Sequence, residues 1–147
     1  MGGLVLDLNR VLRAARPVVF AAFAEPSLLR RWWGPSGFTV PALRFDPQVG
    51  NGYRIEMRPP DGDPFHLSGA FTEVDAPGRL AFTFAWGPPD PDDVETVVGL
   101  SFFDLGASTE LALKQGPFKT EARRALHRDG WSDSFDKLER LLSAQSR

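Results

Sequence analysis

The chain of 147 residues contains no cysteine, a single tyrosine and two histidines. Without cysteine it can have no disulfide framework, no thiolate zinc site and no cysteine nucleophile. Its formal charge of −2, from 17 basic and 19 acidic residues, lacks the basic excess expected of a nucleic-acid-binding protein. No apolar run approaches the roughly 20 residues that a membrane-spanning helix needs. These absences predict a globular protein with few residues available for catalysis.

Targeting signals are also absent from the first residues. Met1–Asp7 has neither the basic region nor the long apolar segment of a signal peptide, so we expect a cytoplasmic protein. The length predicts one domain over residues 1–147, which would bury roughly 70% of the surface of the unfolded chain. We expect a monomer or homodimer with no nucleic-acid partner and no membrane span.

Phenylalanine and tryptophan are plentiful by comparison. The chain has 12 Phe and 4 Trp against one Tyr, so its aromatic surface carries almost no hydroxyl groups. Such side chains either fill a core or line an apolar pocket, and composition alone does not decide between the two.

Hydrophobic periodicity predicts an α+β fold. Leu4–Arg13 alternates like a half-buried strand, and Pro17–Phe23 and Ser27–Trp33 follow as two short helices. About six antiparallel strands come next, over Phe38–Phe45, Tyr53–Met57, Phe65–Val74, Arg79–Trp86, Glu95–Phe103 and Thr109–Lys114. A long C-terminal helix begins at Trp131, and Asp129-Gly130 is expected to separate it from a helical turn or two before it.

Four segments carry a resemblance to a known family: Ala15–Phe20, Trp32–Pro35, Gly69–Val74 and His127–Trp131. Their order and spacing resemble the AHSA-type domain, which is related to the activator of the heat-shock protein 90 ATPase and belongs to the START-like (SRPBCC) superfamily. The resemblance implies a helix-grip fold, in which a curved antiparallel sheet of about six or seven strands wraps around a long C-terminal helix. It also implies a cavity between the sheet and the helix.

The sequence departs from the family pattern in two places. Gln48 replaces an arginine, which removes an anion contact or ion pair, and Gln115 stands near a position where many relatives carry histidine. The large N-terminal domain of the eukaryotic chaperone activator is absent, so we do not expect a chaperone partner.

The sequence contains no complete motif for a metal site, a cofactor site or an enzymatic nucleophile. Asp90, Asp92, Asp93 and Glu95 superficially resemble a calcium loop, but prolines intervene and the turn glycine is missing. We interpret residues 87–93 as a solvated loop that could gate a pocket entrance. We expect no metal and no cofactor, and we assign no catalytic residue.

Three polar residues leave alternatives open. His66 and His127 have no metal-ligating partner at the usual spacing, so each is either an ordinary surface or hydrogen-bonded histidine or a general acid/base. Strict alternation turns Glu73 inward, where an unpaired carboxylate is costly. It would then either form a salt bridge with Arg54 or Arg79 or anchor a ligand.

The aromatic residues decide the functional prediction. The implied fold brings most of them into the space between sheet and helix, where they either fill a solid core or line a cavity. We predict that the protein binds a hydrophobic small molecule, a lipid or an aromatic metabolite, with Glu73 or His127 as the polar contact. The expected ligand-binding residues are Trp33, Phe71, Glu73, Phe82, Phe84, Trp86, Phe102, His127, Trp131 and Phe135.

Two other classes of function remain open at this point. An enzyme could use the same cavity for cyclisation or condensation, which would need an acid/base pair such as Glu73 with His127. A stress-related or co-chaperone-like protein would act through its surface.

Overall fold

The computed structural model describes residues 4–145 and consists of one sheet with three helices. The elements are, in chain order, β1 (Leu4–Leu12), α1 (Arg16–Ala24), α2 (Pro26–Trp32), β2 (Thr39–Arg44), β3 (Gly52–Arg58), β4 (Phe65–Asp75), β5 (Arg79–Gly87), β6 (Thr96–Asp104), β7 (Thr109–Phe118) and α3 (Glu121–Gln145).

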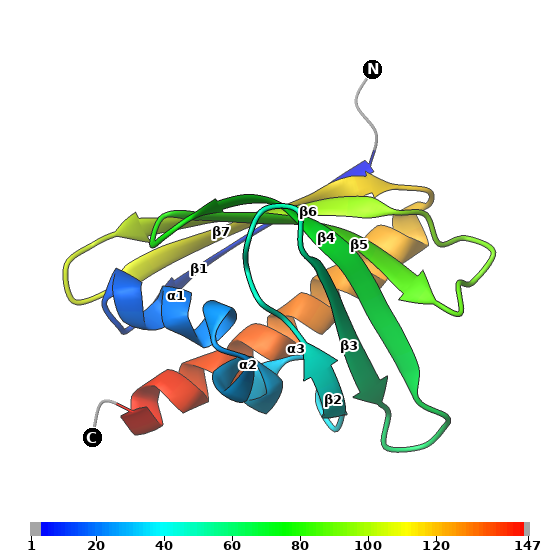
Figure 1. The fold of residues 1–147 in the computed structure, drawn as a ribbon, viewed down its shortest axis with the longest axis horizontal. Helices are drawn as coiled ribbons and strands as arrows, with labels where there is room; N and C mark the ends of the chain where they lie inside the picture. The colour runs from blue at the N-terminus through cyan, green and yellow to red at the C-terminus, as the bar shows by residue number, and fades with distance from the viewer. Residues whose placement is uncertain (1–3, 146–147) are drawn as a thin grey trace.

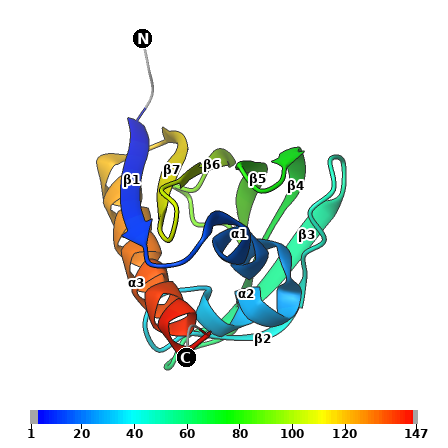
Figure 2. The ribbon, with the colours of Figure 1, turned by 90° about the vertical axis from the view of Figure 1, so that its left-hand side faces the viewer.

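The sheet has seven strands in the order β1-β7-β6-β5-β4-β3-β2, and all neighbouring pairs are antiparallel. It curves over α3, which crosses the whole molecule on one side of the sheet, and α1 and α2 lie on that same side (Figures 1 and 2). This arrangement confirms the predicted helix-grip fold. The predicted strands and the two short helices also agree with the structure to within a few residues.

Proline and short polar side chains set the helix boundaries. Pro17 lies in the first turn of α1 and Pro26 in the first turn of α2, where a missing N–H costs nothing. The hydroxyl of Thr120 accepts a hydrogen bond from the Arg123 N–H at 3.1 Å, so α3 begins with a side-chain cap.

The C-terminal helix differs from the sequence-based prediction. Asp129-Gly130 does not interrupt it, and α3 is continuous from Glu121 to Gln145. A glycine inside a helix costs about 1 kcal/mol relative to alanine. His127, Trp131 and Phe135 are all buried on one face of α3, and their packing outweighs that cost. Strand β7 is also longer than predicted, since it passes through Gly116-Pro117 to Phe118.

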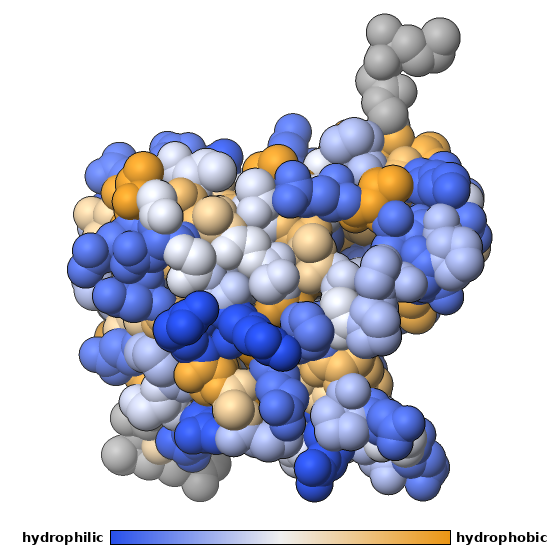
Figure 3. All heavy atoms as spheres, turned by 45° about the vertical axis from the view of Figure 1, so that its right-hand side comes forward, coloured by the Kyte–Doolittle hydropathy of each residue, from blue (hydrophilic) through white to orange (hydrophobic). Residues whose placement is uncertain are grey.

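Most apolar side chains lie between the sheet and the helices. Phe23, Trp32, Phe102 and Phe135 are 0–1% exposed in the part of the core next to α1 and α2. The face shown in Figure 3 is mainly hydrophilic, with small hydrophobic areas between polar residues. Within residues 4–145, no helix is long and apolar enough to cross a membrane.

The single tyrosine belongs to this core. Tyr53 is 2% exposed, and its hydroxyl donates a hydrogen bond of 2.6 Å to the Thr83 carbonyl oxygen. Burial raises the pKa of Tyr53, so the phenol stays protonated. The chain's one aromatic hydroxyl is therefore used structurally.

Candidate functional site

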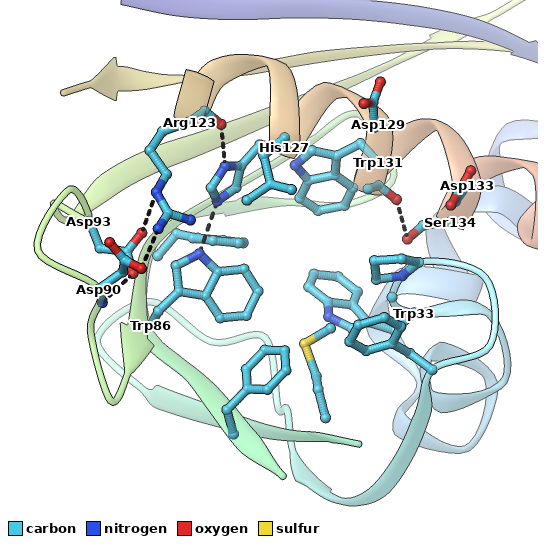
Figure 4. A pocket seen from close by; sticks show the side chains of 18 of the residues that line it. Trp33, Trp86, Asp90, Asp93, Arg123, His127, Asp129, Trp131, Asp133 and Ser134 are labelled. Carbon is cyan, nitrogen blue, oxygen red and sulfur yellow. Dashed lines mark hydrogen bonds and ion pairs between the residues drawn. The ribbon is translucent and has the colours of Figure 1, made fainter. Parts of the chain in front are cut away.

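A pocket of about 360 Å³ opens between the end of β5 and the first half of α3. Figure 4 shows side chains from both elements around it, with Trp86 on one side, His127 and Trp131 above, and Trp33 opposite. Gly34 and Pro35, which follow α2, and Pro88, in the loop after β5, complete part of the rim. The volume lies in the usual range for small-molecule sites, roughly 300–1,000 Å³.

Six aromatic rings form a continuous wall of this pocket. Neighbouring ring centroids are 6.0, 5.4, 5.1, 6.4 and 5.1 Å apart along the series Phe38, Phe65, Trp86, Phe84, Trp131 and Trp33. Most of these contacts are edge-to-face, a favoured geometry for aromatic pairs. The rings therefore support one another and leave part of their surfaces facing the pocket.

His127 fixes the position of Trp86. The Trp86 indole N–H donates to His127 Nε2 at 2.9 Å, and His127 Nδ1 lies 2.6 Å from the Arg123 carbonyl oxygen (Figure 4). Since an indole only donates and a carbonyl only accepts, the histidine is the neutral tautomer protonated at Nδ1. Burial lowers the pKa of His127, which favours the same neutral form.

Gln115 fixes Trp131 in a similar way. Its side-chain oxygen accepts a hydrogen bond of 2.8 Å from the Trp131 indole N–H, and its nitrogen donates to the Thr96 hydroxyl at 2.9 Å. The glutamine is 1% exposed, so both bonds are buried. Two of the pocket's indoles are thus held by buried polar partners: His127, which itself lines the pocket, and Gln115, which does not.

The loop between β5 and β6 is tied to α3 by charged groups. Arg123 Nη2 lies 2.8 Å from a carboxylate oxygen of Asp90, and its Nε lies 3.6 Å from one of Asp93. The hydrogen bond from Arg123 lowers the pKa of Asp90, and the pairing raises the pKa of Arg123. Lys119 donates to the Pro91 carbonyl oxygen at 3.1 Å. The loop that we expected to gate the entrance is therefore attached to the start of α3, with Asp90, Asp93 and Arg123 on the same side of the pocket (Figure 4).

The other side of the rim lies where α3 meets the segment after α2. The Ser36 N–H donates to a carboxylate oxygen of Asp133 at 3.3 Å. Lys137 donates to the carbonyl oxygens of Trp33 and Pro35 at 3.4 and 3.2 Å, and burial lowers its pKa. Together these contacts hold the Trp33 side of the rim against the helix.

The structure places the predicted site residues in two groups. Trp33, Phe84, Trp86, His127 and Trp131 all line the pocket. The remaining predicted aromatic residues, which are at most 2% exposed, lie in the packed core and are absent from the pocket lining: Phe71, Phe82, Phe102 and Phe135.

Glu73 requires a correction, because the structure turns it outward. An irregularity in the β4–β5 pairing lies between Phe71 and Glu73, where β4 has one residue more than its partner. The extra residue shifts the alternation, so that Glu73 is exposed although Phe71 is buried. Its carboxylate lies 3.2 Å from Arg79 Nε. The expected salt bridge with Arg79 is present, but on the outer surface and away from the pocket.

Several lining residues were not predicted from the sequence. Met57 and Phe65 come from β3 and β4, Asp129 and Gly130 come from the place in α3 where we expected a break, and Asp133 comes from the predicted helix that begins at Trp131. Nothing in the local sequence marks Gln115 as the partner of Trp131.

The aspartates of the loop between β5 and β6 form ion pairs with basic side chains. Among residues 4–145, no group of three or more His, Asp or Glu side chains could hold a metal ion. Asp90, Asp92 and Asp93 instead face Arg123 and Lys119.

The curved sheet, the long helix and the pocket between them define a helix-grip protein, and comparisons identify its family. Residues 13–143 match the family model described as Activator of Hsp90 ATPase homolog 1-like protein, so the chain belongs to this family. The comparison with curated proteins found no match.

Solved structures of several bacterial proteins share the fold. An AHSA1 protein from Silicibacter pomeroyi is 28% identical, with a TM-score of 0.85 over 96% of this chain and 99% of its own. A protein from Nitrosomonas europaea is 26% identical, with a TM-score of 0.82 over 97% of this chain and 96% of its own. A Chromobacterium violaceum protein at 24% identity has a TM-score of 0.85 over 94% of this chain and 96% of its own.

Proposed function

We propose that this protein binds a hydrophobic small molecule in the pocket between β5 and α3. The observation that carries the proposal is the wall of six contacting aromatic rings around about 360 Å³ of space. Removing apolar ligand surface from water is worth about 25 cal/mol per Å², before the entropy cost of association is subtracted.

Hydrogen bonds that fix two of the lining side chains support a pocket that stays open for a ligand. Trp86 and Trp131 are each fixed by a hydrogen bond, to His127 and to Gln115, so neither ring can turn inward without losing it. Prepared pockets bind more tightly because less side-chain freedom is lost when the ligand enters.

The enzymatic alternative lacks its catalytic pair. Glu73 lies on the outer surface with Arg79, and both ring nitrogens of His127 already have hydrogen-bond partners. Glu73 is therefore not available beside His127 as the second member of an acid/base pair. The co-chaperone alternative stays a prediction, and titration of the protein with a purified chaperone would test it by the heat of binding.

Two measurements test the binding proposal directly. Native mass spectrometry of freshly purified protein should detect a retained small molecule. For a defined probe, we expect 2-naphthalenemethanol, a neutral two-ring compound, to raise the melting temperature and to quench or shift tryptophan fluorescence. Failure of a screen of such aromatic and aliphatic compounds to change either signal would contradict the proposal.

A pair of variants at Gly130 separates pocket filling from loss of stability. A Cβ atom at this position would lie 3.7 Å from Pro35 Cγ, which is an ordinary contact. We expect Gly130→Ala to raise the free energy of unfolding by about 0.5–1 kcal/mol, because alanine is the better helix former. Gly130→Leu should stay folded but weaken binding of the probe, since the longer side chain occupies pocket volume. Equal binding by both variants and the wild type would mean that the probe binds elsewhere.

A further inference from the structure

The hydrogen-bonding groups in the pocket wall indicate which ligands it can accept. The indole N–H groups of Trp86 and Trp131 donate to His127 and Gln115, so both rings offer their faces rather than donors. The Ser134 hydroxyl donates to the Gly130 carbonyl oxygen at 2.9 Å and retains only its acceptor capacity. A ligand beside these three side chains therefore meets aromatic faces and an acceptor.

The charged groups of the lining are mostly negative. Four aspartates, Asp90, Asp93, Asp129 and Asp133, stand against one arginine, Arg123, among the described residues that line the pocket. Arg123 already pairs with Asp90 and Asp93. An anionic ligand would have to compete with these two carboxylates for the arginine and would meet repulsion from the others.

The two sides of the rim differ in how far their charge is compensated. On the loop side, Arg123 forms ion pairs with both Asp90 and Asp93. On the α3 side, Asp133 accepts a hydrogen bond from the Ser36 backbone, and Asp129 is exposed and has no ion pair among residues 4–145. Lys137, four residues after Asp133 on α3, donates to two backbone carbonyls and also has a Coulombic interaction with Asp133. Among residues 4–145, the charge of Asp129 therefore has no ion-pair partner at this end of the pocket, beside the aromatic wall.

We propose that the pocket selects an amphipathic cation, an apolar group that enters the aromatic wall and carries an ammonium at the Asp129–Asp133 side of the rim. This inference rests on the proposed function and adds the charge of the ligand to it. Aromatic faces attract a cation through the ring quadrupole, with tryptophan the strongest. The two carboxylates add a Coulombic attraction that an uncharged ligand does not gain.

Three probes with the same ring system test the charge preference: 2-naphthylmethylamine, 2-naphthalenemethanol and 2-naphthoate. At pH 7 and low salt they are a cation, a neutral alcohol and an anion. By isothermal titration, we expect the amine to bind about tenfold more tightly than the alcohol, and the carboxylate to bind most weakly. The ratio of amine to alcohol affinity should fall as sodium chloride is added, because salt screens charges near the surface.

Variants then locate the charge. In the double variant Asp129→Asn with Asp133→Asn, the preference for the amine over the alcohol should fall to about twofold or less. The asparagine oxygen can still accept from the Ser36 N–H, so the rim keeps its geometry. Asp61→Asn, in the exposed turn before β4, removes one negative charge outside the pocket and should leave the preference unchanged.

The outcomes distinguish this inference from the proposed function. If the alcohol binds as tightly as the amine, or the carboxylate binds best, the charge selection is wrong but the pocket still binds apolar molecules. If the Asp61→Asn control loses the preference as much as the double variant does, the attraction comes from overall charge and the assigned position is wrong. If none of the three probes binds, both proposals are overturned.

Discussion

Aromatic side chains have opposite roles at the two ends of the space between sheet and α3. Next to α1 and α2, the ring centroid of Phe23 lies 4.7 Å from that of Trp32 and 5.3 Å from that of Phe102, and all three rings are buried. At the other end, the ring centroids of Phe65 and Trp86 are 5.4 Å apart, a similar distance, but both side chains are only half-buried and border the pocket. The difference lies in the covering elements rather than in the residue types.

Helices close one end and leave the other open. Helix α1 contacts β6, and α2 contacts both β2 and α3, so two extra helices cover that half of the sheet (Figure 2). Beyond them, α3 and the segments around Pro35 and Pro88 form the remaining cover. Aromatic content alone therefore predicts neither a core nor a pocket. Whether a ring is buried or borders a pocket depends on whether a helix covers that part of the sheet.

The largest effect that we expect comes from truncating one ring at each end. Phe102→Ala removes a fully enclosed ring and should lower the free energy of unfolding by about 3–5 kcal/mol. Phe65→Ala should cost about 1–2 kcal/mol, because this ring is half-buried and already borders open space. Urea unfolding of both variants checks the contrast, and equal losses would show that the pocket end is packed as tightly as the core.

A smaller loss should follow from removing the buried amide behind the wall. Gln115→Leu keeps a similar volume but leaves the Trp131 indole N–H without its acceptor, at a cost of about 1–3 kcal/mol. Thr96→Val removes the other partner of Gln115 and should cost less, since the indole bond remains. Urea unfolding measures both variants. A neutral Gln115→Leu would mean that Trp131 does not depend on this contact.

The smallest expected effect is a dependence of the unfolding free energy on pH, caused by protonation of His127 at the pocket end. The pKa of His127 is lowered in the folded protein from its ordinary value of 6.5, so below that pH the unfolded chain binds more protons at this position. The stability from His127 is therefore present above about pH 6.5 and lost as pH falls through the lowered pKa. Protonation would also put an N–H of His127 against the Trp86 indole N–H, which should weaken probe binding.

His127→Gln provides the comparison, since glutamine does not titrate and can still accept from Trp86. Unfolding free energies measured from pH 7.5 to 5 should decline less steeply in this variant than in the wild type. Parallel pH profiles would show that another group causes the decline.

Much of the fold could be predicted from the sequence because the apolar pattern repeats regularly along it. The alternation in Leu4–Leu12 and Arg79–Gly87 and the prolines at the start of α1 and α2 are local signals, and the structure agrees with them. The continuity of α3 through Gly130 is not local, since it depends on packing against the sheet.

The site was harder to predict for the same reason. One extra residue in β4 reverses the direction of Glu73, and strict alternation cannot anticipate it. Phe71 and Phe102 lie in β4 and β6, the strands on either side of Phe84 in β5, and only the three-dimensional layering assigns them to the core. The partnership of Gln115 with Trp131 joins β7 to α3 and has no signature in either segment.

The distribution of indoles gives the protein its own optical reporter. Of the 4 tryptophans, Trp33, Trp86 and Trp131 line the pocket, whereas Trp32 is 0% exposed and donates to the Ala22 carbonyl oxygen. The emission of three fluorophores should thus respond to a molecule in the pocket, while the fourth supplies a nearly constant background. Occupancy can be followed in the unlabelled protein, and replacing Trp86 with Phe should remove the component that depends on His127.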